Sequence, residues 1–220
     1  MTTLAPVRSR QVRSAGSTVP KADEKVLTDL YAAHGIGARS RQRASRLLRQ
    51  TGGISEALAC PEPRLRSLGA TQGEIQVLQL VGSAISLALR RPAEERPLLS
   101  TLSSVIDYLH AEMAHRPTEA FRVLFLNGRL RLVHDEIMGI GSIASVDIHP
   151  RTILARALDV GARHILLVHN HPSGDATPTR EDVQLTARVR EAGRMLDVNV
   201  LDHIIVARSG HSSLRSEGLM

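Results

Sequence analysis

The apolar positions of this chain are spaced differently in its first and second parts. In segment 71–91 they recur at three- and four-residue steps, which predicts one long amphipathic helix carrying Ile75, Leu78, Val81, Ile85 and Leu89. Two shorter helical patterns come first: one includes Tyr31, and one runs from Ser40 to Gln50 and ends at Gly52-Gly53. We therefore expect a small all-helical domain over residues 23–91.

The second part of the chain alternates between helix and strand patterns. A helix is expected at about 101–114, followed by a strand at 121–126 and a returning strand from Leu130. Asn127-Gly128 lies between the two apolar runs, and Asn-Gly in that position is a strong hairpin signal.

Further elements follow in the same alternating order. They are a strand around 143–148, a helix from Pro150 to near Gly161, a strand at 165–168, a helix after Thr179, a strand at 198–207 and a short strand after Gly210. Such interleaved elements pack around one mixed sheet, so we predict an α/β/α sandwich. Two prolines and several charges mark residues 92–98 as an exposed linker. The α/β domain should therefore span 99–220.

Composition and charge narrow the range of partners. Hydrophobic residues make up 42% of the chain, enough for a packed core, while the 2% of aromatics argues against a stacking platform for single-stranded nucleic acid. The net charge of +6 permits binding to DNA without requiring it. Part of that charge lies in residues 1–22, which we interpret as a disordered basic arm, with a transit peptide as the alternative.

Cysteine usage and hydropathy indicate the compartment. Cys60 is the single cysteine of the sequence and cannot form an intramolecular disulfide, which fits a reducing compartment. No apolar run approaches the roughly 18 residues that a membrane span needs. We expect a cytoplasmic protein with no membrane partner.

The segment His169-Asn170-His171-Pro172 carries the strongest chemical signal. It follows the apolar run 165–168, and residues i and i+2 of a strand point to the same face, so both imidazoles can converge. Asp182 comes in the first turn of the next helix as a candidate third ligand. Two nitrogens, one carboxylate oxygen and an open position are typical of a catalytic Zn²⁺ site, in which the pKa of bound water falls to about 7.

The same residues also fit roles that need no metal. Thr179 and Asp182 have the spacing of a capping box, which alone would explain both. The letters His-Asn-His suggest an HNH nuclease, but those three residues lie far apart in sequence in that class. Asp202-His203 is a further pair: His203 either orients a metal ligand or, as we favour, is a hydrogen-bonded histidine in a buried strand.

The spacing resembles the JAMM (JAB/MPN) signature H-x-H-P-x6-S-x2-D, with Thr179 in the position of the serine. The words HNHPSGDATPTREDVQLT, HPRTILARAL and LDHIIV are closest to the RadC branch. The resemblance covers the last 120 residues or so and implies a JAMM/MPN fold, which is cytidine-deaminase-like. It implies a hydrolase in which Glu119 is the general base and Thr179 stabilises an oxyanion. Glu136 is the rival candidate for the base.

These features predict a zinc-dependent metallohydrolase, a peptidase or isopeptidase, with metal ligands His169, His171 and Asp182. The alternative is a DNA-associated repair accessory protein with a structural or vestigial metal site. A deaminase is a weaker possibility, because that class carries the H-x-E and P-C-x-x-C words and this chain has no second cysteine. Neither the substrate nor the oligomeric state follows from the sequence.

DNA binding would involve the N-terminal helices. Gly35-Ile36-Gly37 and Leu68-Gly69-Ala70 are possible turns of a helix-hairpin-helix, which presents backbone N–H groups to phosphate. The RadC resemblance implies a glycine-hydrophobic-glycine word near Gly69-Ala70-Thr71, from which this chain departs. A glycine between helices is otherwise a C-cap.

Overall fold

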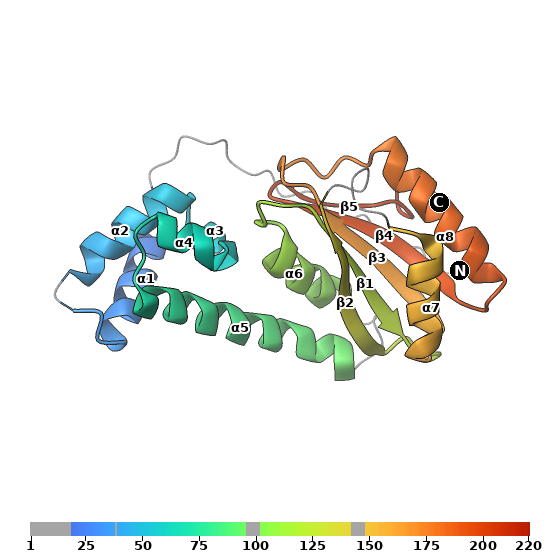
Figure 1. Cartoon of the computed structure of the whole chain (residues 1–220), viewed down its shortest axis with the longest axis horizontal. Helices are drawn as coiled ribbons and strands as arrows, with labels where there is room; N and C mark the ends of the chain where they lie inside the picture. Colours follow the sequence, from blue (N-terminus) through green and yellow to red (C-terminus); the bar gives the residue numbers. More distant parts are fainter. Residues whose placement is uncertain (1–18, 38, 96–101, 142–147) are drawn as a thin grey trace. The chain divides into compact units, whose positions relative to one another are not determined.

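A computed structural model describes residues 19–37, 39–95, 102–141 and 148–220 of the chain (Figure 1). The chain divides into two compact units, one ending at Pro117 and the other beginning at Thr118. The strand predicted around 143–148 and most of the predicted basic arm fall outside the described residues.

The first unit is helical, as its apolar spacing predicts. Its helices are α1 (Lys21–Ala33), α2 (Ser40–Thr51), α3 (Ile54–Ala59), α4 (Glu62–Ser67), α5 (Gln72–Glu95) and α6 (Leu102–Met113). Sequence periodicity does not reveal α3 and α4, because six residues are too few to repeat a 3.6-residue pattern. Helix α5 continues past Pro92 to Glu95, so the first residues of the predicted linker are helical.

The core of the helical unit is aliphatic apart from one tyrosine. Its fully buried members include Leu27, Tyr31, Leu47, Leu48, Leu65, Ile75 and Leu78. Gly52 ends α2 in the left-handed conformation, at φ 107°, where a side chain would be strained. The predicted stop at Gly52-Gly53 is therefore confirmed.

The second unit is built on a mixed five-stranded sheet in the order β2-β1-β3-β4-β5. Its elements are β1 (Ala120–Leu126), β2 (Leu132–Ile140), α7 (Pro150–Asp159), β3 (His164–Asn170), α8 (Arg180–Arg194), β4 (Asn199–Ala207) and β5 (Gly210–Ser213). Only β3 and β4 pair in parallel; the other neighbours among the described strands are antiparallel. The predicted α/β class with a mixed sheet and flanking helices is confirmed.

The predicted hairpin joins β1 to β2, but its loop is longer than a two-residue turn. Asn127 Oδ1 accepts hydrogen bonds from Arg129 N at 2.9 Å and Arg131 N at 3.1 Å. Leu130 lies in the left-handed region, at φ 59°. The returning strand therefore begins at Leu132 rather than at Leu130.

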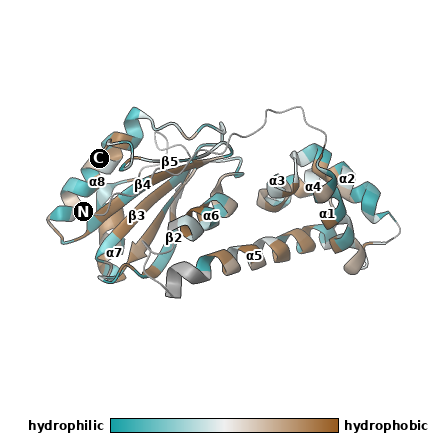
Figure 2. Ribbon diagram, turned by 180° about the vertical axis from the view of Figure 1, so that it is seen from behind, coloured by the Kyte–Doolittle hydropathy of each residue, from teal (hydrophilic) through white to brown (hydrophobic). Residues whose placement is uncertain are grey.

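Successive side chains of the central strands point to opposite faces of the sheet, so every second residue packs against the helices. One face of β1 and β3 packs on α7 and α8 through Phe121, Val123, Phe125, Ile165 and Leu167 (Figure 1). The opposite residues Leu124, Leu166 and Val168 are buried as well, so the middle of each strand is buried on both faces, and β3 is largely brown in Figure 2. His169 continues the face that carries Ile165 and Leu167 and so faces α8. None of the described helices is long and apolar enough to cross a membrane.

Candidate metal centre

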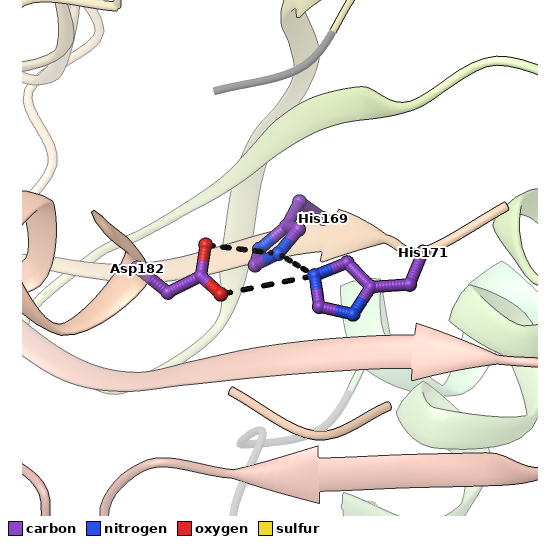
Figure 3. A group of neighbouring side chains, drawn as sticks. All are labelled: His169, His171 and Asp182. Carbon is purple, nitrogen blue, oxygen red and sulfur yellow. Dashed lines mark hydrogen bonds and ion pairs between the residues drawn. The ribbon is translucent and has the colours of Figure 1, made fainter. Parts of the chain in front are cut away.

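The three predicted ligands meet between the end of β3 and the start of α8 (Figure 3). His169 Nε2 lies 2.9 Å from His171 Nε2 and 3.2 Å from Asp182 Oδ1, and His171 Nε2 lies 3.7 Å from Asp182 Oδ2. Donor atoms that share one tetrahedral zinc ion lie about 3.3 Å apart. The spacing and the nitrogen–oxygen donor set therefore suit a divalent metal ion such as zinc.

Strand pairing aims both histidines to the same side. His169 lies opposite Phe121 on β1 and Ile205 on β4. His171 N donates to Val206 O at 2.9 Å, so extended pairing continues for one residue beyond β3. The intervening Asn170 points to the other face, which confirms the predicted i, i+2 arrangement.

Asp182 is held by the start of α8. Thr179 is the N-cap, and its Oγ1 and N both donate to Asp182 Oδ2 at 2.7 Å, while Asp182 N donates back to Thr179 Oγ1 at 3.3 Å. The predicted capping box is confirmed. It occupies Oδ2 and leaves Oδ1 beside His169, so capping and an approach to the metal centre coexist in one carboxylate.

A second layer of hydrogen bonds lies behind the two histidines. His171 Nδ1 is 2.8 Å from Asp175 O, and His169 Nδ1 is 2.8 Å from His203 Nε2. The favoured interpretation of His203, as a hydrogen-bonded histidine in a buried strand, is confirmed, and its ring also contacts His169, as the alternative required. Asp202 instead accepts from His203 N, Ser213 Oγ and Arg215 N, as expected if the pair points to opposite faces.

The charges around the site favour a cation. Burial on its own would raise the pKa of Asp182, but the neighbouring His169 and His171 hold that pKa well below its usual range. The neighbouring Asp182 carboxylate raises the pKa of His171, with smaller contributions from Asp175 and the charge of Glu119. Complete burial lowers the pKa of His203. The lowered pKa favours the ionised carboxylate, the form that a metal ligand needs.

The two candidates for the base have different surroundings. Glu119 directly precedes β1, and its charge reaches His171. Its backbone is fixed on both sides, because Glu119 O accepts from Gly141 N at 2.8 Å, and the Asn170 side chain accepts from Ala120 N at 2.8 Å and donates to Thr118 O at 3.3 Å.

Glu136 lies one strand further out, opposite Val123. Its Oε2 accepts from Arg156 Nε at 2.6 Å and lies 3.0 Å from His134 Nε2. The hydrogen bond from Arg156 lowers the pKa of Glu136, so this carboxylate is engaged in an ion pair away from the three converging side chains.

The fold and the site define an α/β domain that carries a His-x-His and Asp group able to hold a metal ion. Comparison with known families agrees: the profile of the "RadC-like JAB domain" matches residues 99–219. A curated relative, a UPF0758 protein of Rhodobacter capsulatus, is 39% identical over 178 residues, which cover 80% of this chain and 83% of the relative. The chain therefore belongs to the RadC family.

Proposed function

We propose that the protein is a zinc-dependent hydrolase of the JAMM type that cleaves peptide or isopeptide bonds. One observation carries the proposal. Among the described residues the metal-binding group has three members, and it opens to solvent at His171, whose side chain is 14% exposed, while His169 and Asp182 are buried. A structural zinc site is closed by four protein ligands, whereas a catalytic one keeps a position open.

Each residue has a role in this proposal. His169, His171 and Asp182 would hold the ion, which when bound lowers the pKa of water and polarises a carbonyl group. Glu119 would accept the proton of the attacking water and pass it to the leaving amine. Thr179 would donate to the developing oxyanion, for which its hydroxyl must turn away from Asp182 Oδ2.

The test combines metal content with hydrolysis. Elemental analysis should find about one zinc per wild-type chain and per Glu119→Gln chain, and none in His169→Ala or Asp182→Ala. Hydrolysis of a library of peptide and isopeptide substrates should fall by about 100-fold or more in Glu119→Gln, because the general base is lost. Glu136→Gln, the matched control, should keep both zinc and activity.

Two results would count against this assignment. Equal zinc in wild type and in His169→Ala would remove the metal centre from these residues. Full activity in Glu119→Gln with bound zinc would leave the metal centre in place but reject Glu119 as the base.

A second candidate function, DNA binding, is supported by helix α2. Its sequence SRQRASRLLRQT contains four arginines and no acid, and Arg41 and Arg49 are exposed. Such a helix can contact phosphates, and that binding weakens steeply between about 50 and 200 mM salt. Gly69 supports it less, since Ala70 N donates to Leu65 O and the turn acts as a C-cap of α4.

Charge reversal on α2 tests DNA binding in the full chain. The double variant Arg41→Glu/Arg49→Glu should lose salt-sensitive binding of a labelled duplex in fluorescence anisotropy. The double variant Arg188→Glu/Arg194→Glu, which changes the net charge equally on α8, should retain it. Equal loss in both would assign the binding to overall charge, and no binding by wild type at low salt would reject this function.

A further inference from the structure

A buried chain of hydrogen bonds runs behind His169 and returns to the other predicted ligand. His169 Nδ1 lies 2.8 Å from His203 Nε2, His203 Nδ1 lies 2.6 Å from Thr186 Oγ1, and Thr186 Oγ1 donates to Asp182 O at 2.6 Å. All of these side chains are completely buried apart from that of Asp182, which is nearly so. The chain links β3, β4 and α8 in a closed loop around the site.

Counting hydrogens gives the loop a direction. A backbone carbonyl can only accept, so the single hydroxyl hydrogen of Thr186 goes to Asp182 O. Thr186 Oγ1 must then accept from His203 Nδ1–H. A neutral imidazole with hydrogen on Nδ1 has a lone pair on Nε2, and this lone pair accepts from His169 Nδ1–H.

The direction of the loop decides whether His169 Nε2, the ring atom that faces the site, carries a hydrogen or a lone pair. With its hydrogen on Nδ1, His169 presents a lone pair at Nε2 toward His171 and Asp182. The opposite direction would turn the Thr186 hydroxyl hydrogen toward His203 and leave two acceptor oxygens, Thr186 Oγ1 and Asp182 O, only 2.6 Å apart. It would also leave the hydrogen of a neutral His169 on Nε2, where it would block a metal ion.

We propose that His203 and Thr186 are positioning residues, which hold His169 in the tautomer that can bind metal and fix its distance from Asp182. His171 achieves the same tautomer with a nearby backbone carbonyl, that of Asp175. In the loop just described, the acceptor for His169 Nδ1–H is not a nearby backbone carbonyl but His203 on β4, which is held in turn by Thr186 on α8. The inference rests on the proposed function, because it takes His169 and Asp182 as metal ligands.

Substitutions at Thr186 test the loop with little change of volume. Thr186→Val removes the hydroxyl, whereas Thr186→Ser keeps it and is the matched control. Loss of an outer hydrogen-bond partner typically weakens metal binding by about 10- to 100-fold. We expect that loss in zinc affinity, measured by chelator competition on the full chain, for Thr186→Val and for His203→Leu. His203→Gln, whose amide can both accept and donate, should restore most of the affinity.

Histidine ¹⁵N NMR spectroscopy of the metal-free chain reads the tautomer directly. Wild type and Thr186→Ser should show His169 protonated on Nδ1, and Thr186→Val should show a mixture of tautomers. Matching thermal unfolding of the metal-free variants would show that the fold is retained. An unchanged tautomer and unchanged zinc affinity in a folded Thr186→Val would overturn the proposal. A wild-type chain that has the expected tautomer yet binds no zinc would support the loop and reject the proposed function.

Discussion

At the scale of single residues, Glu136 shows how a carboxylate that the sequence offers as a catalytic base can serve another purpose. Its ion pair with Arg156 lowers its pKa, so it is charged in the fold at pH values where it would begin to protonate in the unfolded chain. The pair therefore stabilises the fold above the unfolded pKa of about 4.5 and loses this contribution as pH falls through the lower, folded pKa.

Glu136→Gln should lower the free energy of unfolding at pH 7 by less than about 1 kcal/mol, because the Glu136 side chain is 37% exposed and the pair is screened by solvent. Urea unfolding of both proteins from pH 7 down to acid should show the difference shrinking as pH falls below the unfolded pKa. A difference that grows toward acid would contradict the assigned ion pair.

The residues of the site could be predicted to the extent that their spacing is local. His169 and His171 share a strand, and Asp182 follows in the first turn of the next helix, so strand and helix geometry places them together. His203 and Thr186 contact His169 and Asp182 through β4 and through the second turn of α8. No periodicity joins residues 34 positions apart, so an orienting role for His203 could be named from the sequence only as an alternative, and the contact of Thr186 with His203 could not be foreseen.

At the scale of elements, the side chain of Asn170 extends the pairing of β1 with β3. The last backbone pair is Phe121 with His169, and beyond it Asn170 Oδ1 accepts from Ala120 N in place of a backbone carbonyl. Asn170 also donates to Thr118 O, so it fixes the backbone on both sides of Glu119.

Asn170→Ala should cost about 1–3 kcal/mol of stability, since it leaves buried backbone groups without partners. Because the metal-binding side chains remain, zinc content should stay near wild type while hydrolysis falls. Asn127→Ala is the matched control: it also removes an asparagine that accepts from two backbone N–H groups, but in the distal hairpin loop. Equal activity in the two variants would show that Asn170 has no influence on Glu119.

Element boundaries were predictable where a chemical signal marks them. Pro150 opens α7, Thr179 caps α8 and Gly52 ends α2, each as the sequence indicates. The pattern gives no signal for α3 and α4, which are single turns or little more. It also ends α5 too early, because the apolar spacing stops near Leu89 while the backbone stays helical to Glu95.

At the scale of the whole molecule, the change from a helical to an alternating sequence pattern predicts a helical part followed by an α/β part. It does not predict which of the two parts contains α6. Helix α6 packs with α5 and falls in the helical unit, whereas the family match begins at residue 99, before α6. A helix whose apolar face can cover either neighbour cannot be assigned from its own periodicity. The sequence places the domain boundary at the predicted linker, residues 92–98. The boundary between the two compact units lies later in the chain, at Pro117.

The candidate metal centre lies wholly within the unit that begins at Thr118, and this predicts how bound zinc should stabilise the molecule. A ligand stabilises what it binds by about 2.7 kcal/mol when its free concentration is 100 times its dissociation constant. Hydrogen exchange with and without zinc should therefore show stronger protection of amides in β3, β4 and α8, with little change in α1 and α2. A chelator should reverse the effect, and His169→Ala should abolish it. Equal protection throughout both units would mean that they unfold as one cooperative body, because the free energy of zinc binding would then be shared by the whole chain.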